Sequence, residues 1–167
     1  MGATLTRVPE FDKLPRDLEL LLSGEAFRKR NRLILPFLTL DPAGFPRACL
    51  LTLSEIRARS RTALSVAVRT GSHTAANLIR RHNAALLYLA RDRAVWIQAR
   101  AGRGRNCDAE PGRQIFPLSV FRVKVDRPNA AEETLSLAAG PTVSARAAGT
   151  LFSEALFEEL GIDGAQT

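Results

Sequence analysis

Short apolar segments separated by turn signals run through the middle of the chain. Leu33 to Leu40 is a continuous apolar run, and the turn sequence DPAG at residues 41–44 separates it from a second strand over Arg47 to Ser54. This order predicts a β-hairpin. Pro36 has no backbone N–H and therefore favours an edge or bulged strand for the first segment. A third strand is expected over Thr62 to Val68, where bulky residues alternate with small ones and one bulky face points inward.

The apolar period becomes helical after Gly71. Apolar residues at positions 75, 78 and 79 share one face of a helix. Ser72 is a suitable N-cap, and Arg80, Arg81 and His82 suit the last turn, where the helix dipole favours positive charge. We therefore expect a helix over residues 72–82.

Three further strands are expected after this helix. They cover Ala84 to Ala90, Ala94 to Ala101 and Ser119 to Asp126. A loop rich in Gly, Arg and Asp, residues 102–113, precedes the last of them. Its Arg103–Asn106 segment could contact a polyanion, but we interpret it as a solvated, mobile loop.

The ends of the chain complete the predicted architecture. Residues 1–14 are expected to form an irregular leader, residues 15–30 a helical region and residues 151–160 a C-terminal helix. Six or seven short strands with one inserted helix predict a mainly β fold, a small antiparallel barrel with its core over residues 33–126 of a single domain, 1–167. Such a short barrel cannot hide all its apolar strand faces, which favours a homodimer.

Composition and charge narrow the classes of function. The 167 residues are 46% hydrophobic, contain no apolar run long enough to span a bilayer and begin without a signal-peptide pattern, so we expect a cytoplasmic protein with no membrane partner. The net charge of +7 comes almost entirely from arginines scattered along the chain, which does not favour nucleic acid as a partner. Cys49 lies in an apolar run and Cys107 in a polar loop, and neither belongs to a Cys/His cluster, so no metal site is expected. We interpret the acidic pair Glu158-Glu159 as part of a solvated helix face.

The stretch from Val68 to Thr74 contains the most suggestive chemistry. A strand ends here, Gly71 permits a tight turn and a helix begins with a hydroxyl cap. The N–H groups of a first helical turn favour an anion. A capped helix with no ligand is the alternative interpretation of the same residues. Further donors to an anion could come from Arg69, Ser72, His73 and Thr74.

The same stretch carries a family resemblance. Residues 70–78, with the sequence TGSHTAANL, resemble the T-x-S-x-K-x-x-N-L pattern of the pyridoxamine 5′-phosphate oxidase-like, FMN-binding split barrels. The hairpin at residues 39–53 resembles the opening segment of that family, and Val95 to Ala101 resembles the strand after its helix, with Ala99 where glycine is usual. The resemblance covers about residues 30–126 and implies an antiparallel split β-barrel of about six strands.

The resemblance also implies a function. It suggests an FMN-binding flavoprotein, an oxidoreductase acting on a small-molecule substrate, with the flavin in a groove at the dimer interface. Two strand segments would hold the ring and the start of the helix would hold the phosphate. The cofactor-binding residues implied in this way are Cys49, Leu50, Leu51, Thr52, Ala67, Val68, Arg69, Ser72, His73 and Thr74.

The sequence departs from the family at its basic positions. The arginine and lysine of the second strand fall on Cys49 and Ser54, and the basic pair at the helix start falls on His73 and Thr74. The C-terminal substrate-binding segment of true pyridoxamine phosphate oxidases has no counterpart, so oxidation of vitamin B6 is not expected and the pattern identifies no catalytic residue. The alternative is a non-catalytic split barrel that has lost the flavin and binds haem, or a polyanion such as nucleic acid.

Overall fold

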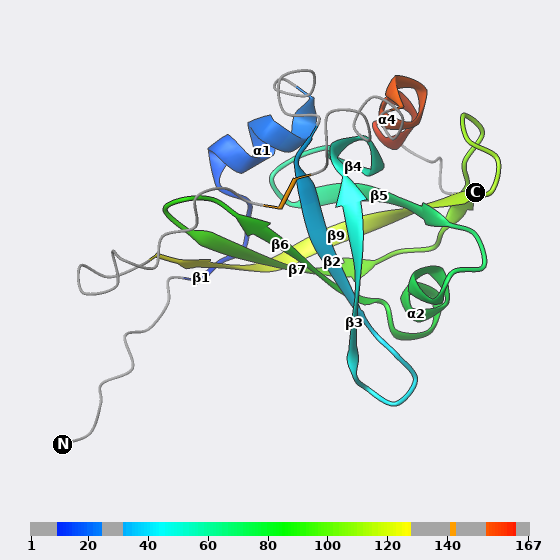
Figure 1. Ribbon diagram of the computed structural model, residues 1–167, viewed down its shortest axis with the longest axis horizontal. Coiled ribbons are helices and arrows are strands. Elements are labelled where there is room, and N and C mark those ends of the chain that lie inside the picture. Colours follow the sequence, from blue (N-terminus) through cyan, green and yellow to red (C-terminus); the bar gives the residue numbers. More distant parts are fainter. Residues whose placement is uncertain (1–9, 25–31, 128–140, 143–152, 163–167) are drawn as a thin grey trace.

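One curved antiparallel sheet dominates the computed structural model, which describes residues 10–24, 32–127, 141–142 and 153–162 (Figure 1). The strands are β1 (Glu10–Phe11), β2 (Ile34–Leu40), β3 (Pro46–Thr52), β4 (Ile56–Ala58), β5 (Ala63–Arg69), β6 (Asn83–Leu89), β7 (Ala94–Ala101), β8 (Arg105–Asn106) and β9 (Arg113–Asp126). Their order across the sheet is β3-β2-β6-β7-β9-β5-β4, and β1 and β8 pair with β9. The sheet curls into the half-open barrel that the sequence predicts.

Short helices lie at the two ends of this sheet. They are α1 (Arg16–Ser23), the 3-10 helix η1 (Leu53–Glu55), α2 (His73–Arg81) and α4 (Glu154–Leu160). In the view of Figure 1, α1 and α4 lie along the upper side of the sheet and α2 lies at the lower right. No helix in the described part of the chain is both long enough and apolar enough to cross a membrane.

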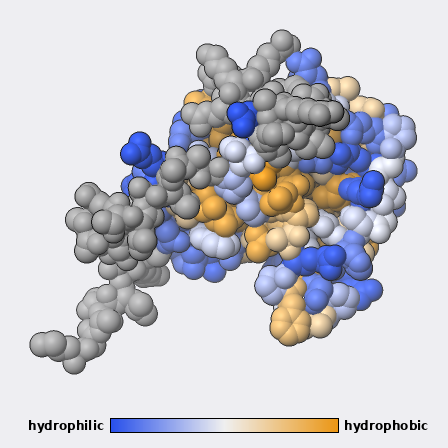
Figure 2. All heavy atoms as spheres, in the orientation of Figure 1, coloured by the Kyte–Doolittle hydropathy of each residue, from blue (hydrophilic) through white to orange (hydrophobic). Residues whose placement is uncertain are grey.

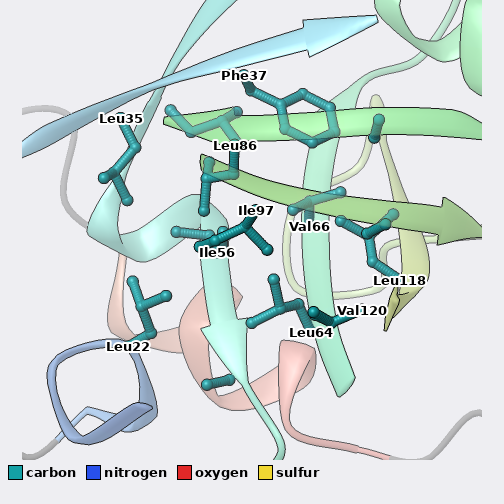
Figure 3. Packing of buried hydrophobic residues seen from close by; sticks show 14 of the residues in the cluster. Leu22, Leu35, Phe37, Ile56, Leu64, Val66, Leu86, Ile97, Leu118 and Val120 are labelled. Atoms are coloured by element: carbon teal, nitrogen blue, oxygen red, sulfur yellow. The ribbon is translucent and has the colours of Figure 1, made fainter. Parts of the chain in front are cut away.

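Inward side chains from opposing strands of the curled sheet fill the barrel interior. Alternate residues of β6 and β7 point inward, as the period of two along a strand requires. The inward side chains of β2, β5 and β9 meet them, and α1 closes one end with three buried leucines. Figure 3 shows this packing, in which the labelled side chains include Phe37, Leu86, Ile97, Val66 and Leu118.

A second, smaller core lies on the outer side of β5 under α4. It contains Ala67, Cys107, Ile115, Leu156 and Leu160. The bulky residues of β5 point into the barrel interior, as the sequence predicts, and α4 covers the other face of the strand. Cys107 is likewise buried, although its neighbours in the sequence are polar.

Two predictions about edges and ends are also corrected. Pro36 does not mark an edge strand, because β2 lies between β3 and β6. Proline is tolerated there because β6 pairs with β2 only over Phe37–Thr39, beyond the proline. Glu10–Phe11, expected in an irregular leader, form β1 and pair with Val123 and Lys124. The predicted leader, helical region and C-terminal helix also include residues 1–9, 25–30 and 151–152, which lie outside the described residues.

Candidate functional site

A pocket of about 580 Å³ lies where β3, β5, the start of α2 and the turn before β9 meet. We call it the α2 pocket. Its volume is within the range of small-molecule and cofactor sites. It is lined by Cys49, Leu50, Leu51, Glu55, Ala67, Val68, Arg69, Ser72, Thr74, Glu110, Pro111, Gly112 and Arg113.

The start of α2 presents hydrogen-bond donors to this pocket. Gly71 has a positive φ of 72°, which lets the chain turn sharply from β5 into the helix. The Ser72 hydroxyl oxygen accepts a hydrogen bond from the Ala75 N–H at 3.1 Å, so Ser72 is the N-cap, as the sequence predicts. The N–H groups of His73 and Thr74 have no backbone acceptor among the described residues. Free amides and a helix dipole at one point suit an anion.

The β3 wall of the pocket is apolar and carries a thiol. Cys49 is half-buried and lies directly opposite Phe37 in the β2–β3 register. Burial raises the pKa of the Cys49 thiol, a hydrogen bond with Thr74 lowers it, and the nearby Glu55 carboxylate raises it, with a net upward shift. The thiol is therefore neutral near pH 7 and offers a polarisable, uncharged contact.

Four charged side chains also line the pocket, those of Glu55, Arg69, Glu110 and Arg113. Arg113 donates from Nη1 to Glu55 Oε1 and from Nε to Glu110 Oε2, both at 2.6 Å. Burial lowers the pKa of Arg113, but the Glu55 and Glu110 carboxylates raise it by more, so the guanidinium keeps its charge. Arg69 lies directly opposite Arg113 in the β5–β9 register. The formal charges of these two arginines and two glutamates cancel.

The turn that supplies Glu110 to Arg113 is fastened by Glu159 of α4. Glu159 is only 7% exposed, and its carboxylate accepts hydrogen bonds from the N–H groups of Asp108 at 3.0 Å and Ala109 at 2.7 Å. It also accepts from Arg105 at 2.5 Å and from the Cys107 thiol at 3.1 Å. Burial raises the pKa of Glu159, but these hydrogen bonds lower it by more, so that the pKa falls to about 2.

These contacts overturn two interpretations of the sequence. Glu159 is not on a solvated helix face, because α4 turns it toward the loop; its neighbour Glu158 is exposed, as expected. The Arg103–Asn106 segment is not a solvated, mobile loop, because Arg105–Asn106 form β8 on β9 and Arg105 is bonded to Glu159. Residues 110–113, further along the same anchored loop, line the α2 pocket.

The structure brings together eight of the ten residues predicted to bind a cofactor. Thr52 and His73 do not line the pocket. Thr52 is buried, and its hydroxyl group forms hydrogen bonds with Ser54 and Glu55. The His73 side chain is exposed and lies outside the pocket. As cofactor contacts, all ten remain predictions.

Sequence reasoning missed the residues that reach the pocket from elsewhere. Glu55 had a usable signal, because Thr52 and Glu55 form a capping box whose T-x-x-E spacing is visible in the sequence. Residues 110–113 had none, because they reach α2 only through the pairing of β5 with β9. That pairing continues past the strand ends, where the Thr70 N–H donates to the Gly112 carbonyl oxygen at 2.8 Å.

A second pocket, of about 380 Å³, is lined by Ile79, His82, Arg103, Phe116 and four neighbouring residues. It contains none of the residues predicted to bind a cofactor. We therefore place the candidate site in the α2 pocket.

Solved structures share this fold, although no protein-family model and no curated protein sequence matches the chain. An F420 reductase aligns with a TM-score of 0.51 and 15% identity over 66% of this chain and 98% of its own. A Lactobacillus delbrueckii protein, with pyridoxamine 5′-phosphate oxidase as its proposed activity, aligns with a TM-score of 0.50 and 18% identity over 68% and 94% of the two chains. An FMN-binding protein from Syntrophomonas wolfei gives a TM-score of 0.51 and 11% identity over 68% and 90%. The chain therefore has the split β-barrel fold of these proteins, which confirms the fold implied by the sequence resemblance.

Proposed function

We propose that the α2 pocket binds FMN and that the protein is a flavin-dependent oxidoreductase acting on a small-molecule substrate. One observation carries the proposal: residues expected to hold the phosphate and residues expected to hold the ring line a single pocket at the start of α2. Solved structures of the same fold include an FMN-binding protein and an F420 reductase, which supports a flavin-type ligand.

The residues present fit the two ends of FMN differently. The phosphate suits the start of α2, where the Ser72 hydroxyl can still donate its own hydrogen and the Thr74 N–H has no backbone acceptor among the described residues. The apolar ring system suits Cys49–Leu51 on β3 and Ala67–Val68 on β5. When bound, the flavin supplies the redox chemistry, and the protein binds and orients it.

The other described residues of the pocket set its polarity. Burial of the ring against Leu51 and Val68 excludes water from that side. Glu55 and Glu110 balance the two arginines, so the phosphate depends on directed hydrogen bonds more than on net positive charge. This compensates in part for the basic residues that the sequence lacks at positions 49, 54, 73 and 74.

The purified protein is expected to show the visible absorption of a flavin, or to acquire it when apoprotein is titrated with FMN. Arg69→Ala should weaken FMN binding by about threefold to tenfold, or ~0.65–1.4 kcal/mol, because it removes a charge-assisted hydrogen bond from an exposed side chain. His73→Ala is the matched control and should change the dissociation constant by less than about twofold, since its side chain does not line the pocket.

Two results would contradict the flavin proposal. Wild-type protein that neither carries nor binds FMN at millimolar concentration would give precedence to the non-catalytic split barrel. A haem spectrum in the purified protein would identify a different ligand.

An Arg69→Ala protein with unchanged affinity for FMN would contradict only the place of the phosphate, which would then not lie beside Arg69.

We also propose that the protein works as a homodimer that associates through the face around β3, with the α2 pocket at its border. β3 is an edge strand of the sheet. Leu50 on β3 is 60% exposed and Phe45, at the tip of the β2–β3 hairpin, is 70% exposed. Figure 2 shows apolar side chains gathered at the centre of the face that β2 and β3 cross in Figure 1. An exposed apolar patch on an edge strand favours self-association.

Light scattering at micromolar concentration is expected to give twice the mass of one chain. Phe45→Glu should shift the population toward monomer, because a charge would be buried in the apolar interface. Ile162→Glu introduces the same charge at another exposed apolar position, after α4, and should leave the dimer intact. A wild-type monomer at this concentration would exclude the proposal.

A further inference from the structure

We propose that Arg113 is the anion-binding residue of the α2 pocket and that Glu110 is a competing carboxylate, which the bound anion displaces. All three members of the Glu55–Arg113–Glu110 cluster line the pocket. The inference rests on the proposed function for the identity of the ligand, because the anion would be the phosphate of the bound nucleotide. Anion binding at Arg113 can nevertheless be tested without flavin.

The Arg113 guanidinium is only partly occupied by its two carboxylates. Glu55 accepts a hydrogen bond from Nη1 and Glu110 accepts one from Nε. Nη2 makes no hydrogen bond with any described residue. Nε and Nη2 form one edge of the planar group, and phosphate or carboxylate binds such an edge through two parallel hydrogen bonds. Glu110 uses only half of this edge. An oxyanion of the ligand that replaced Glu110 would therefore gain a hydrogen bond.

The two carboxylates differ in how firmly they are held. Both oxygens of Glu55 are engaged, since Oε1 faces Arg113 and Oε2 accepts from the N–H and hydroxyl groups of Thr52 at 2.8 and 3.0 Å. The Glu55 side chain is 15% exposed and that of Glu110 is 31% exposed. Among the described residues, a single hydrogen bond reaches the Glu110 carboxylate, from Arg113. Glu55 therefore holds Arg113 in place, which lowers the entropic cost of binding, while Glu110 is free to exchange.

Arg113 also lies close in the fold to the start of α2. It faces Arg69 across the β5–β9 ladder, and the hydrogen bond from Thr70 to Gly112 ties the turn before β9 to the turn before α2. The cation that the family supplies from the second strand and the helix start is absent from those positions. Here Arg113 of β9 would supply it.

The test uses inorganic phosphate as the probe. Its dissociation constant is obtained from the rise of the thermal unfolding midpoint with phosphate concentration, against chloride at the same ionic strength and pH. Arg113→Gln should weaken phosphate binding by about tenfold, and Glu110→Gln should tighten it by about threefold, because it frees the Nε–Nη2 edge and removes a negative charge. The charge-matched controls Arg80→Gln and Asp92→Asn change exposed residues outside the pocket and should stay within about twofold of wild type.

Opposite effects of two substitutions in one ion-pair cluster distinguish binding from structure. A purely structural cluster would lower the unfolding midpoint of both variants without changing its response to phosphate, and this result overturns the inference. So does a wild-type protein that phosphate does not stabilise. If Arg113→Gln fails to fold, Glu110→Gln decides alone, by tightening phosphate binding or not.

The same variants separate this inference from the proposed function. Phosphate binding that follows the expected order, in a protein that does not bind FMN, supports the anion site and rejects the flavin proposal. FMN binding that neither Arg113→Gln nor Glu110→Gln changes rejects the anion site and leaves the flavin proposal standing.

Discussion

Glu159→Gln is expected to lower the free energy of unfolding by about 2–4 kcal/mol at pH 7. The wild-type carboxylate accepts from two backbone N–H groups, one on each oxygen, and from Arg105. Glutamine has one oxygen and one NH₂ group, so one buried N–H would face another donor and the ion pair to Arg105 would be lost. Urea unfolding at pH 7 measures the difference.

The pH dependence of stability gives the same residue a second readout. The pKa of Glu159 falls from an ordinary 4.5 to about 2 in the folded protein. Because the folded-state pKa is depressed, the carboxylate stabilises the protein fully above its unfolded pKa, and this contribution is lost as pH falls toward 2. The wild-type protein should lose roughly 3 kcal/mol over this window from this group. Glu159→Gln lacks this contribution, so the two proteins should converge in stability at low pH.

Glu158→Gln is the matched control for this experiment. Glu158 precedes Glu159 on α4, but its side chain is exposed and pairs with Arg57 at the surface. Its substitution should cost less than about 1 kcal/mol. Equal losses from the two glutamines, or a difference between wild type and Glu159→Gln that persists at low pH, would contradict the assigned role of Glu159.

Phe37→Ala is expected to destabilise the protein by about 3–5 kcal/mol, because it leaves a cavity in the barrel interior. Phe37 is fully buried among the side chains shown in Figure 3. It also stands opposite Cys49 in the β2–β3 register, so the cavity lies behind the β3 wall of the α2 pocket. Chemical denaturation measures the loss of stability.

Phe121→Ala removes the same side chain from the outer face of β9. The ring is half-exposed and contacts the Arg100 guanidinium at 5.7 Å from its centroid. This contact is worth less than about 1 kcal/mol at an exposed site. Comparable losses from the two phenylalanines would show that Phe37 is not in a packed interior.

Several elements could be predicted from sequence because their signals are local. β7 spans Ala94 to Ala101, and Ser72 caps α2. Alternation of side chains and the capping of a helix depend on residues within a few positions of each other. The grouping of Cys49, Val68 and Ser72 was predicted from the family resemblance and not from physics alone.

The tertiary structure decided the charged chemistry of the site. Arg113 lies 58 residues from Glu55, and Glu159 lies 51 residues from Asp108. A glutamate on a short amphipathic helix has the same local pattern whether it faces water or a loop. Only the docking of α4 on the outer face of β5 determines that Glu158 is exposed and Glu159 buried.

By itself, the sequence determined the positions of β2, β3, β5, β6 and β7, the second half of β9, the start of α2 and the likeness to a flavin-binding barrel, because alternation, glycine turns and caps act over a few residues. The pairing of β5 with β9 and the docking of α4 decided that Glu110 and Arg113 line the α2 pocket and that Glu159 fastens the loop that carries them. Partners of buried charges are selected by desolvation and hydrogen-bond geometry between distant segments. Those quantities exist only once the chain has folded.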